Sequence, residues 1–535
     1  MTKKVKCHDF EMLEELILPK KILKCEAVCD AEQLTVDKAP CVSFNSKGCA
    51  FFSKKGAWVL IDFGKEICGS ARIIAKDISY LETSFRFTFG ESVSEACSEI
   101  GLKNATNNHS PRDFSALVSC NSDINYGNTG FRFLRLELLE DRPTRIQSIF
   151  AVNRLPYIED EAVIKTSDEE LNSIIDTATY TLKLNMQNGY FWDGIKRDRL
   201  IWSGDLHGEV LTSLYLFGDT KNVRSSIEFL KSTTDSSCWM NGIPSYSAWW
   251  IINLCDYCTI CGNNKFFEEN SDYAEEIFEH INNCITDDAE IVMEDNIEMK
   301  YFLDWGTYES DDAYIGTAML FILAAQKYLK LHDNSNCHSI ISKLDKYIYA
   351  ETVSKQARAF QILAGRKSDG DDAFLEKDGA SGFSTFMAYY ILSAYVIADG
   401  KKSFQLIKQY YGGMLSKGAT SFWEDFDIKW LENTCGIDEF PTDGQLDIHG
   451  DFGNYCYTGF RHSLCHGWSC SVVLFIIESI FGIRFENGCR RVYIKSNDVE
   501  FNYNINLPTP YGDLFIKKTE CGIEINAPHE IEIIG

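Results

Sequence analysis

The chain has 535 residues, of which 45% are hydrophobic, and its formal net charge at pH 7 is −26. A chain of this length exceeds the size at which a single hydrophobic core stops growing, so we expect a large domain with smaller ones attached. The negative charge argues against nucleic-acid partners and anionic membranes and favours an uncharged substrate, although it also serves solubility alone.

Neither a targeting signal nor a membrane span is evident in the sequence. The stretch MTKKVKCHDFEMLEELILPKK lacks an apolar signal-peptide core, and no apolar run reaches the length of a membrane span. The 20 cysteines are scattered, which predicts mostly reduced thiols and a cytoplasmic location. Cys255, Cys258 and Cys261 are spaced as in an iron–sulfur run, but a fourth cysteine followed by proline is missing. The favoured interpretation is a helix closed by Gly262, with the thiols packed as small hydrophobes.

Three regions with different periodicity follow one another along the chain. Short alternating strands such as AWVLIDFG and FRFLRLELL occur up to about residue 155, so residues 1–160 are predicted to form an antiparallel β-sandwich. A helical pattern begins near Ser167 and continues without strands, which predicts a closed toroid of helical hairpins over residues 161–484. Strand patterns return in RVYIKSN and DLFIKKTECGIEINAP, so residues 485–535 are expected to form a small β domain.

The loop DGIKRDRLIWSGDLHGEV, residues 193–210, concentrates charge around an indole. Ser203 is predicted to cap the following helix, which places Asp205 in its first turn, where the helix dipole favours a carboxylate. Asp193 and Asp198 lie upstream in the entering loop. One interpretation is a cluster of surface ion pairs with the neighbouring arginines. The other is a sugar site, because an indole face packs well against the C–H groups of a sugar ring.

A second segment far along the chain has the same character. KGATSFWEDFDIKW combines Trp423 with Glu424, Asp425 and Asp427. Hydrolysis of a glycoside needs two carboxyl groups that flank one bond, so two such segments suit that chemistry. Taken alone, Glu424 is better interpreted as an ordinary solvated acid at the start of a helix.

These two segments resemble the α-L-rhamnosidases of glycoside hydrolase family 78. The family loop has the form Asp-x-x-x-Arg-(acid)-x-Leu-x-Trp-x-Gly-Asp, and this chain reads Asp193-Gly-Ile-Lys-Arg197-Asp198-Arg-Leu200-Ile-Trp202-Ser-Gly204-Asp205. The family's late Gly-Ala-Thr-Thr-x-Trp-Glu segment is similar to residues 418–424. FGESVSE near residue 90 is similar to a family strand end, and Arg461-His462-Ser463 stands where the family has Asn-His-Tyr. The resemblance spans most of the chain and implies an (α/α)6 catalytic toroid between two β domains.

The resemblance also implies roles for individual residues. Asp198 takes the position of the general acid and Glu424 that of the general base of an inverting glycosidase that releases terminal α-L-rhamnose or a related sugar. The positions implied to bind or enclose the sugar are Asp193, Arg197, Trp202, Asp205, Trp249, Trp250 and His462. No cofactor or metal is implied, and the expected partner is a carbohydrate such as a rhamnoside.

Some positions depart from the family pattern. The acid position is often Glu in the family and is Asp198 here, Gly194-Ile195 replaces a Cys-Pro pair, and Ser463 replaces a Tyr. A general acid must stay protonated near neutral pH, which burial and neighbouring carboxylates favour. Arg197 and Arg199 are therefore expected to point away from Asp198 or to pair with the other aspartates.

Other polar segments are weaker candidates. Asp304 and Glu309 are expected to line the same funnel, and the acidic loop GIDEFPTDGQLDIHGD is expected to lie over the pocket mouth. No ligand spacing in that loop supports a metal site. His466 is interpreted as a core histidine.

Two other functions remain open on the sequence alone. A catalytically silent carbohydrate-binding protein on the same scaffold is compatible with the shorter acid at residue 198. Another (α/α)6 carbohydrate-active enzyme, such as a different glycosidase or a lyase, is the third reading. A lyase needs a Tyr or His base and a cationic grip on uronates, and the acidic chain disfavours that reading. The oligomeric state is not predicted.

Overall fold

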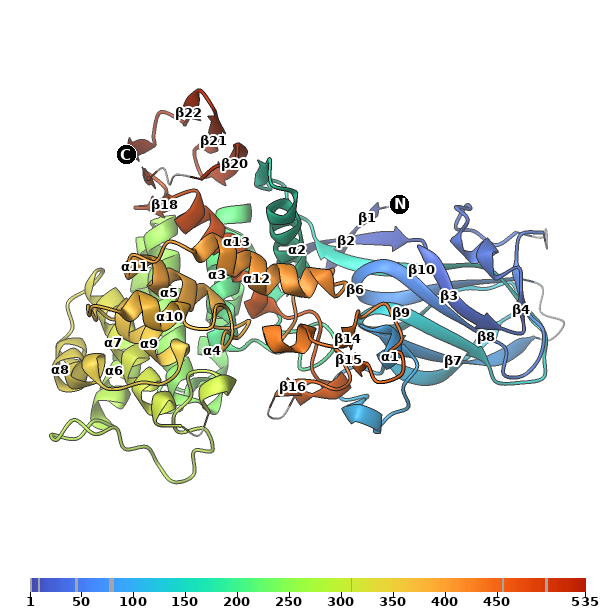
Figure 1. Cartoon of the computed structure of the whole chain (residues 1–535), viewed down its shortest axis with the longest axis horizontal. Helices are drawn as coiled ribbons and strands as arrows, with labels where there is room; N and C mark the ends of the chain where they lie inside the picture. Colours follow the sequence, from blue (N-terminus) through green and yellow to red (C-terminus); the bar gives the residue numbers. More distant parts are fainter. Residues whose placement is uncertain are drawn as a thin grey trace.

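The computed structural model describes residues 2–7, 10–43, 47–76, 81–308, 310–454, 457–495 and 499–535. An N-terminal β domain, a helical domain and a C-terminal β region follow one another along the chain (Figure 1). The predicted fold class is confirmed. No helix in the described part of the chain is long and apolar enough to cross a membrane.

The N-terminal domain is one antiparallel sheet whose long strands bend around a shared core. The strand order is β1-β2-β10-β6-β9-β7-β8, with β3 paired to β6, and β5 paired to both β4 and β10. Alternating aromatic residues such as Phe85, Phe87 and Phe89 on β7 are fully buried, as expected for strands with one face on a core. The strands are β1 (Thr2–Cys7), β2 (Phe10–Ile17), β3 (Lys21–Glu26), β4 (Val28–Cys29), β5 (Ala50–Phe52), β6 (Trp58–Lys76), β7 (Glu82–Gly90), β8 (Asp113–Ser119), β9 (Asp123–Leu138) and β10 (Thr144–Pro156).

The helical domain is a ring of hairpins. Helices α3, α5, α7, α9, α11 and α13 contact one another in that order, and α13 returns to α3, which closes the ring. These helices are buried over most of their surface, whereas α4, α6 and α8 are amphipathic and lie outside. The helices are α2 (Glu169–Asn185), α3 (Ser203–Phe217), α4 (Lys221–Thr233), α5 (Pro244–Cys261), α6 (Asn264–Asn283), α7 (Asp311–Leu329), α8 (Ser335–Leu344), α9 (Lys355–Leu363), α10 (Asp371–Glu376), α11 (Ala388–Ile397), α12 (Ser403–Ser416) and α13 (Val472–Phe475).

Helix α5 shows how the sequence sets the ends of an inner helix. Pro244 occupies its first turn, where a missing N–H costs nothing, and Gly262 follows it at φ 63°, a left-handed conformation that favours glycine. Cys255 and Cys258 are buried on this helix as free thiols. This arrangement agrees with the structural interpretation of the cysteine cluster.

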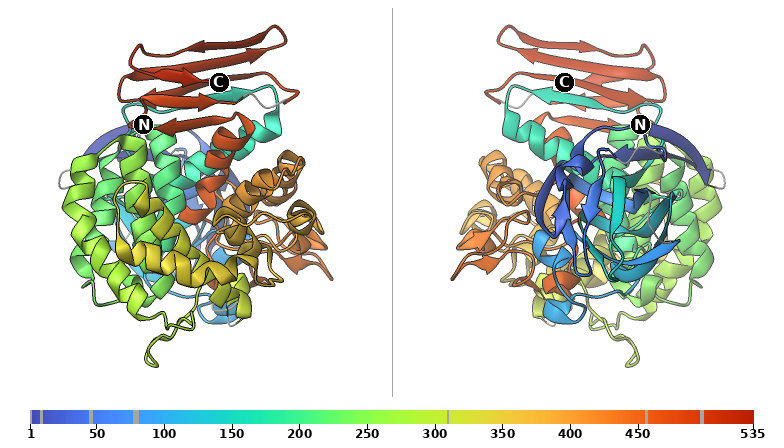
Figure 2. Two further views of the ribbon diagram at one scale, coloured as in Figure 1. Left: turned by 90° about the vertical axis from the view of Figure 1, so that its left-hand side faces the viewer. Right: turned by 90° about the vertical axis from the view of Figure 1, so that its right-hand side faces the viewer.

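The C-terminal region contains two small sheets. One pairs β18 (Ile483–Glu486) with β19 (Arg491–Ile494), and β19 with β23 (Glu532–Ile534). The other has the order β11-β20-β21-β22, with β20 (Tyr503–Thr509), β21 (Gly512–Thr519) and β22 (Gly522–Asn526). Strand β11 (Val163–Thr166) belongs to this second sheet although it precedes α2, and Figure 2 shows it among the C-terminal strands. The sheet therefore includes a strand from the predicted helical range 161–484.

Irregular segments at one end of the ring carry the candidate site. They are the loop after β13 (Tyr190–Phe191), the 3-10 turn η4 (Trp305–Thr307), the segment after α12, and residues 457–471 with the turns η7 (Gly459–Arg461) and η8 (Gly467–Ser471). Helix α1 (Val93–Ala96) follows strand β7 and donates a backbone hydrogen bond from Val93 to Ile437 in the segment after α12. The N-terminal domain thus packs against the segments that form the site.

Candidate active site

Both predicted carboxylate segments face one pocket of about 120 Å³. Asp193, Asp198, Trp202 and Asp205 line it from the first segment, and Glu424 lines it from the second. The beginning of α3 differs from the prediction, because Trp202 and not Ser203 occupies the N-cap, and no side chain caps the helix. Asp205 lies in the first turn as predicted.

A larger cavity of about 470 Å³ adjoins this pocket on the Glu424 side. The two cavities share Trp305, Glu424, Tyr457 and Trp468. Asp304 lines the larger cavity, as expected for the funnel, while Glu309 lies outside the described residues. Asp425 also lines the larger cavity. Burial and the nearby charges of Asp304 and Glu424 raise its pKa to about 7.

A single guanidinium joins the two residues predicted to be acid and base. Arg197 donates from Nη1 to Asp198 and from Nη2 to Glu424, and its Nε donates to the Arg461 carbonyl at 2.8 Å. Its guanidinium also lies over the Tyr457 ring, 3.7 Å from the centroid. Burial opposes the charge, but Glu424 and Asp198 outweigh it and raise the pKa of Arg197. This corrects the expectation that Arg197 points away from Asp198.

The backbone at Asp198 adopts an unusual conformation. Asp198 and Arg199 have φ values of 55° and 56°, in the left-handed region that non-glycine residues rarely adopt. This turn sends Arg199 away from the pocket, as expected, where it donates to the carbonyls of Ile195 and Asn128 at 2.9 and 3.0 Å. The Asp198 side chain, 12% exposed, lies 3.2 Å from the Nε2 atom of His109 in the N-terminal domain.

Glu424 is held on both oxygens and on its backbone. Its Oε1 accepts from Arg197, its Oε2 accepts from the Ser463 N–H at 2.7 Å, and its own N–H donates to the Ser463 carbonyl at 2.9 Å. The side chain is 3% exposed. The Thr385 hydroxyl and the Trp468 indole N–H both donate to the Glu424 carbonyl. The carboxylate is therefore fixed in a pocket wall rather than solvated.

The other two pocket aspartates have elevated pKa values. Burial, with the nearby charges of Asp205 and Asp198, raises the pKa of Asp193 well above its usual range. Burial raises the pKa of Asp205 to about 8, although a hydrogen bond from the Tyr246 hydroxyl at 3.3 Å opposes this. Near neutral pH the Asp205 carboxyl is therefore largely protonated and able to donate a hydrogen bond as well as accept one.

The comparisons with known proteins concern the family and the fold. Residues 159–368 match the family model described as the bacterial alpha-L-rhamnosidase 6 hairpin glycosidase domain. This part of the chain is similar to the α-L-rhamnosidases. No curated protein matches the sequence.

Three solved structures show the same fold across most of the chain. The GH78 family rhamnosidase of Bacillus sp. GL1 superposes with a TM-score of 0.74 at 18% identity, covering 94% of this chain and 55% of that one. The rhamnosidase from Klebsiella oxytoca with rhamnose bound has a TM-score of 0.68 at 20% identity, covering 87% and 95%. The Streptomyces avermitilis alpha-L-rhamnosidase complexed with L-rhamnose has a TM-score of 0.72 at 13% identity, covering 99% and 50%. This chain thus spans about half the length of the Bacillus and Streptomyces proteins.

Four residues expected at the sugar, Arg197, Trp249, Trp250 and His462, line neither cavity. Trp249 packs among His207, Phe360 and Tyr390, and Trp250 is fully buried with its indole N–H donating to the Ile227 carbonyl. Tyr246, about one turn earlier on α5, lines the pocket in their place. Residues three and four apart share a face of an α-helix, so the difference lies along the helix axis: Ile243 and Tyr246 at the start of α5 line the pocket, whereas Trp249 and Trp250 lie about one turn further along.

The positions predicted for His462 and His466 in the late loop are reversed in the structure. His462 is fully buried, with its Nδ1 on the Gly459 carbonyl and its ring against His449. His466, expected in the core, lines the pocket, and its Nε2 lies 3.8 Å from Glu424 and 3.9 Å from Asp205. Burial lowers the pKa of His466, so it is neutral near pH 7. The hydrophobic pattern of the loop gave no signal that separates the two positions.

The acidic loop at residues 436–451 packs on the N-terminal domain instead of the pocket mouth. Asp438 lies 3.6 Å from Arg132, Asp451 lies 2.6 Å from Lys103, and His449 contacts the Ser92 hydroxyl at 2.7 Å. Its residues line neither cavity. The prediction that this loop lies over the pocket mouth is therefore wrong.

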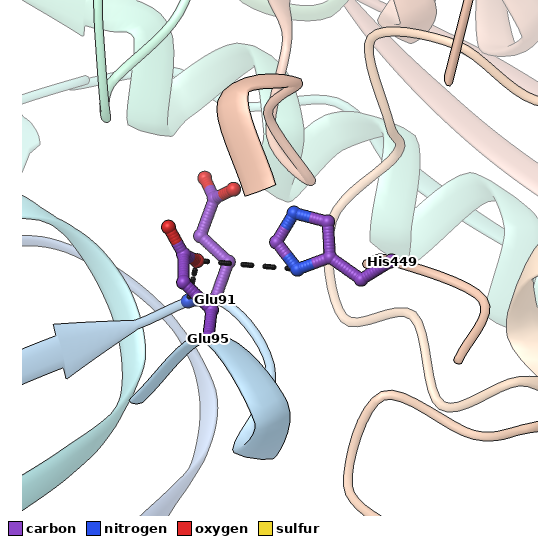
Figure 3. Close-up of side chains that lie close together, drawn as sticks. All are labelled: Glu91, Glu95 and His449. Carbon is purple, nitrogen blue, oxygen red and sulfur yellow. Dashed lines mark hydrogen bonds and ion pairs between the residues drawn. The ribbon is translucent and has the colours of Figure 1, made fainter. Parts of the chain in front are cut away.

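Glu91, Glu95 and His449 form a buried cluster with the spacing of a metal site (Figure 3). The Lys196 ammonium lies 3.0 Å from Glu91 and 3.2 Å from Glu95, so a cation from the chain already neutralises the carboxylates. Both ring nitrogens of His449 also have protein partners, the Ser92 hydroxyl and the His462 carbonyl. The donor set therefore fits a buried ion network better than a metal ion.

Proposed function

We propose that the chain is an inverting glycoside hydrolase that releases terminal α-L-rhamnose, or a related sugar, from glycosides. Asp198 acts as general acid and Glu424 as general base. The observation that carries this proposal is the Arg197 guanidinium, which holds both carboxylates at the wall of one pocket that also contains Trp202. The family match and the fold support it.

In this mechanism Asp198 gives its proton to the glycosidic oxygen while Glu424 removes a proton from a water molecule. The water oxygen bonds to the anomeric carbon from the opposite face, and the electrons of the broken C–O bond leave with the protonated aglycone. In the free protein, Asp198 accepts a hydrogen bond from the Arg197 guanidinium. Sugar binding therefore has to weaken that contact before the acid is ready.

The remaining pocket groups suit the binding of the sugar. The carboxyl groups of Asp193 and Asp205 line the pocket and are able to form hydrogen bonds with sugar hydroxyls, and the Trp202 indole offers a face for the ring C–H groups. We also propose a cytoplasmic location, which the free thiols of the described cysteines support.

The test uses Asp198→Asn and Glu424→Gln on two rhamnosides, one with an acidic phenol as leaving group and one natural. Loss of the acid should cost about 10²–10⁴-fold on the natural substrate and much less on the phenol, which leaves without protonation. Loss of the base should slow both. Proton NMR of the first-formed sugar should show the inverted anomer. A retained anomer, or full activity of Asp198→Asn on the natural rhamnoside, would overturn the mechanism.

A catalytically silent sugar-binding protein is the second candidate. It is favoured by the pairing of both carboxylates with Arg197, since an acid engaged by a guanidinium is a poor proton donor. Turnover of an aryl α-L-rhamnoside by the wild-type chain excludes this candidate. Binding of rhamnose without turnover would establish it.

A further inference from the structure

The end of β7 in the N-terminal domain reaches the back of the proposed base. Glu91 follows β7 directly, is fully buried, and faces the turn at Ser463 and Leu464. Its Oε1 accepts from the Ser463 hydroxyl at 2.8 Å, and its Oε2 accepts from the Leu464 N–H at 2.6 Å. One carboxylate from another domain thus fixes two consecutive residues of this turn.

The same turn holds the Glu424 carboxylate. The Ser463 N–H donates to Oε2 at 2.7 Å, and the Ser463 carbonyl accepts from the Glu424 N–H at 2.9 Å. Ser463 therefore uses its hydroxyl toward Glu91 and its backbone toward Glu424. A continuous chain of hydrogen bonds joins the N-terminal domain to the proposed base; Glu91 and Ser463 are fully buried, and Glu424 is 4% exposed.

Lys196 connects this chain to the segment of the proposed acid. Its ammonium lies 3.0 Å from Glu91 and donates to the His462 carbonyl at 2.8 Å. Lys196 is 5% exposed and precedes Arg197, which grips both Asp198 and Glu424. Glu91 thus contacts the Asp198 segment directly, through Lys196, and Glu424 indirectly, through Ser463.

We propose that Glu91 is a positioning residue for Glu424 and acts through the Ser463 turn. This inference rests on the proposed role of Glu424 as general base. The N-terminal domain then completes the active site, although Glu91 is not among the residues that line the sugar pocket. The physical reason is that two buried donors, the Ser463 hydroxyl and the Leu464 N–H, need the Glu91 oxygens, and an unpaired buried donor is costly.

A change at Glu91 should therefore move the turn and the base with it. In Glu91→Gln the side chain keeps its size but presents an NH₂ group where one of the two donors needs an acceptor. A misplacement of about 1 Å can cost on the order of 10²-fold in rate. We expect kcat on an aryl α-L-rhamnoside to fall about 10- to 100-fold, with KM changed less than about 2-fold because the sugar contacts remain.

Asp62→Asn is the matched control. Asp62 is also a fully buried carboxylate of the N-terminal domain, and it pairs with Arg132, which donates to the Gly418 carbonyl of the helical domain at 2.9 Å. It contacts neither Ser463 nor Glu424 in the described hydrogen bonds. The control should lower the melting temperature and leave kcat within about 2-fold, because the stability change of a buried interdomain pair need not move the base. An equal loss of kcat in both variants would refute the inference, because Glu91 would then contribute to domain packing alone.

A double-mutant cycle separates a positional effect on the base from a general effect on the pocket. If Glu91 acts through the base, adding Glu91→Gln to Glu424→Gln should leave the residual kcat within about 2-fold, since coupled residues are not additive. A full, additive loss would refute the inference. If Glu424→Gln itself retained full activity, the proposed base would fail, whereas an impaired Glu424→Gln with a fully active Glu91→Gln would refute this inference alone.

Ser463→Ala provides a second route if Glu91→Gln does not fold. It removes the hydroxyl that bonds Glu91 and keeps the backbone N–H that bonds Glu424. We expect kcat to fall about 3- to 10-fold, the equivalent of about one hydrogen bond, with the same absence of further loss in the Glu424→Gln background. An unchanged kcat in folded Ser463→Ala would contradict the proposed path.

Discussion

Replacing Arg197 with Met should expose the cost of placing two carboxylates in one buried pocket. Met fills a similar length but supplies no charge and no donor. Asp198 and Glu424 then lose their shared partner, and their side chains are only 12% and 3% exposed, so water compensates poorly. Breaking a buried ion pair by removing one partner costs about 3–5 kcal/mol. We expect the free energy of unfolding at pH 7 to fall by that amount.

The assay is urea denaturation of four proteins: wild type, Arg197→Met, Asp198→Asn/Glu424→Gln, and the triple variant. In the Asp198→Asn/Glu424→Gln background, Arg197→Met should lower the free energy of unfolding by about 2–3 kcal/mol less than it does in the wild-type background. This difference is within the range of coupling energies between contacting residues. Arg199→Met is the matched control, because Arg199 lies in the same loop and donates to carbonyls instead of carboxylates. Its cost should be the same in both backgrounds. Equal costs of Arg197→Met in both backgrounds would refute the assigned pairing.

Three further outcomes follow from the pocket. Burial raises the folded-state pKa of Asp205 to about 8, above the unfolded value near 4, so folding favours the protonated form. The free energy of unfolding should therefore fall as pH rises from about 4 to 8. Urea titrations at several pH values should show a smaller fall in Asp205→Asn. Trp202→Ala should raise KM about 2- to 10-fold, the loss of roughly 0.5–1.5 kcal/mol of stacking, whereas Trp250→Phe should lower the melting temperature and spare KM. Chelator treatment should leave kcat unchanged, because the Lys196 ammonium neutralises the Glu91 and Glu95 carboxylates; loss of activity restored by one divalent ion would contradict this.

Periodicity was sufficient to predict the order of the domains. The change from period 2 to period 3.6 near Ser167 marks the beginning of the helical ring, and the return to strands marks its end. It could not assign β11 (Val163–Thr166) to the C-terminal sheet, because the partner strand β20 lies more than 300 residues later. Strand pairing over such distances depends on tertiary packing rather than on the local pattern.

The site was predictable where residues are close in sequence and not where the fold brings distant loops together. The spacing of Asp193, Asp198 and Asp205 already placed three carboxyls at one helix mouth. The choice between Tyr246 and Trp249 depended on how far along α5 the pocket reaches, and the choice between His462 and His466 depended on the path of one loop. Neither the depth of a pocket nor the path of a loop is encoded in composition or charge.

The carboxyl groups of the pocket differ in role because their environments differ. Asp193 and Asp205 are buried away from the guanidinium's hydrogen bonds, and burial favours their neutral forms. Asp198 and Glu424 instead share hydrogen bonds with Arg197. Different environments for neighbouring acids are how proteins divide acid and base chemistry at one pH. Both oxygens of Asp198 have protein partners, Arg197 and His109, so a hydrolase of this design must draw Asp198 away from one of them when the sugar enters, because the glycosidic oxygen needs that position.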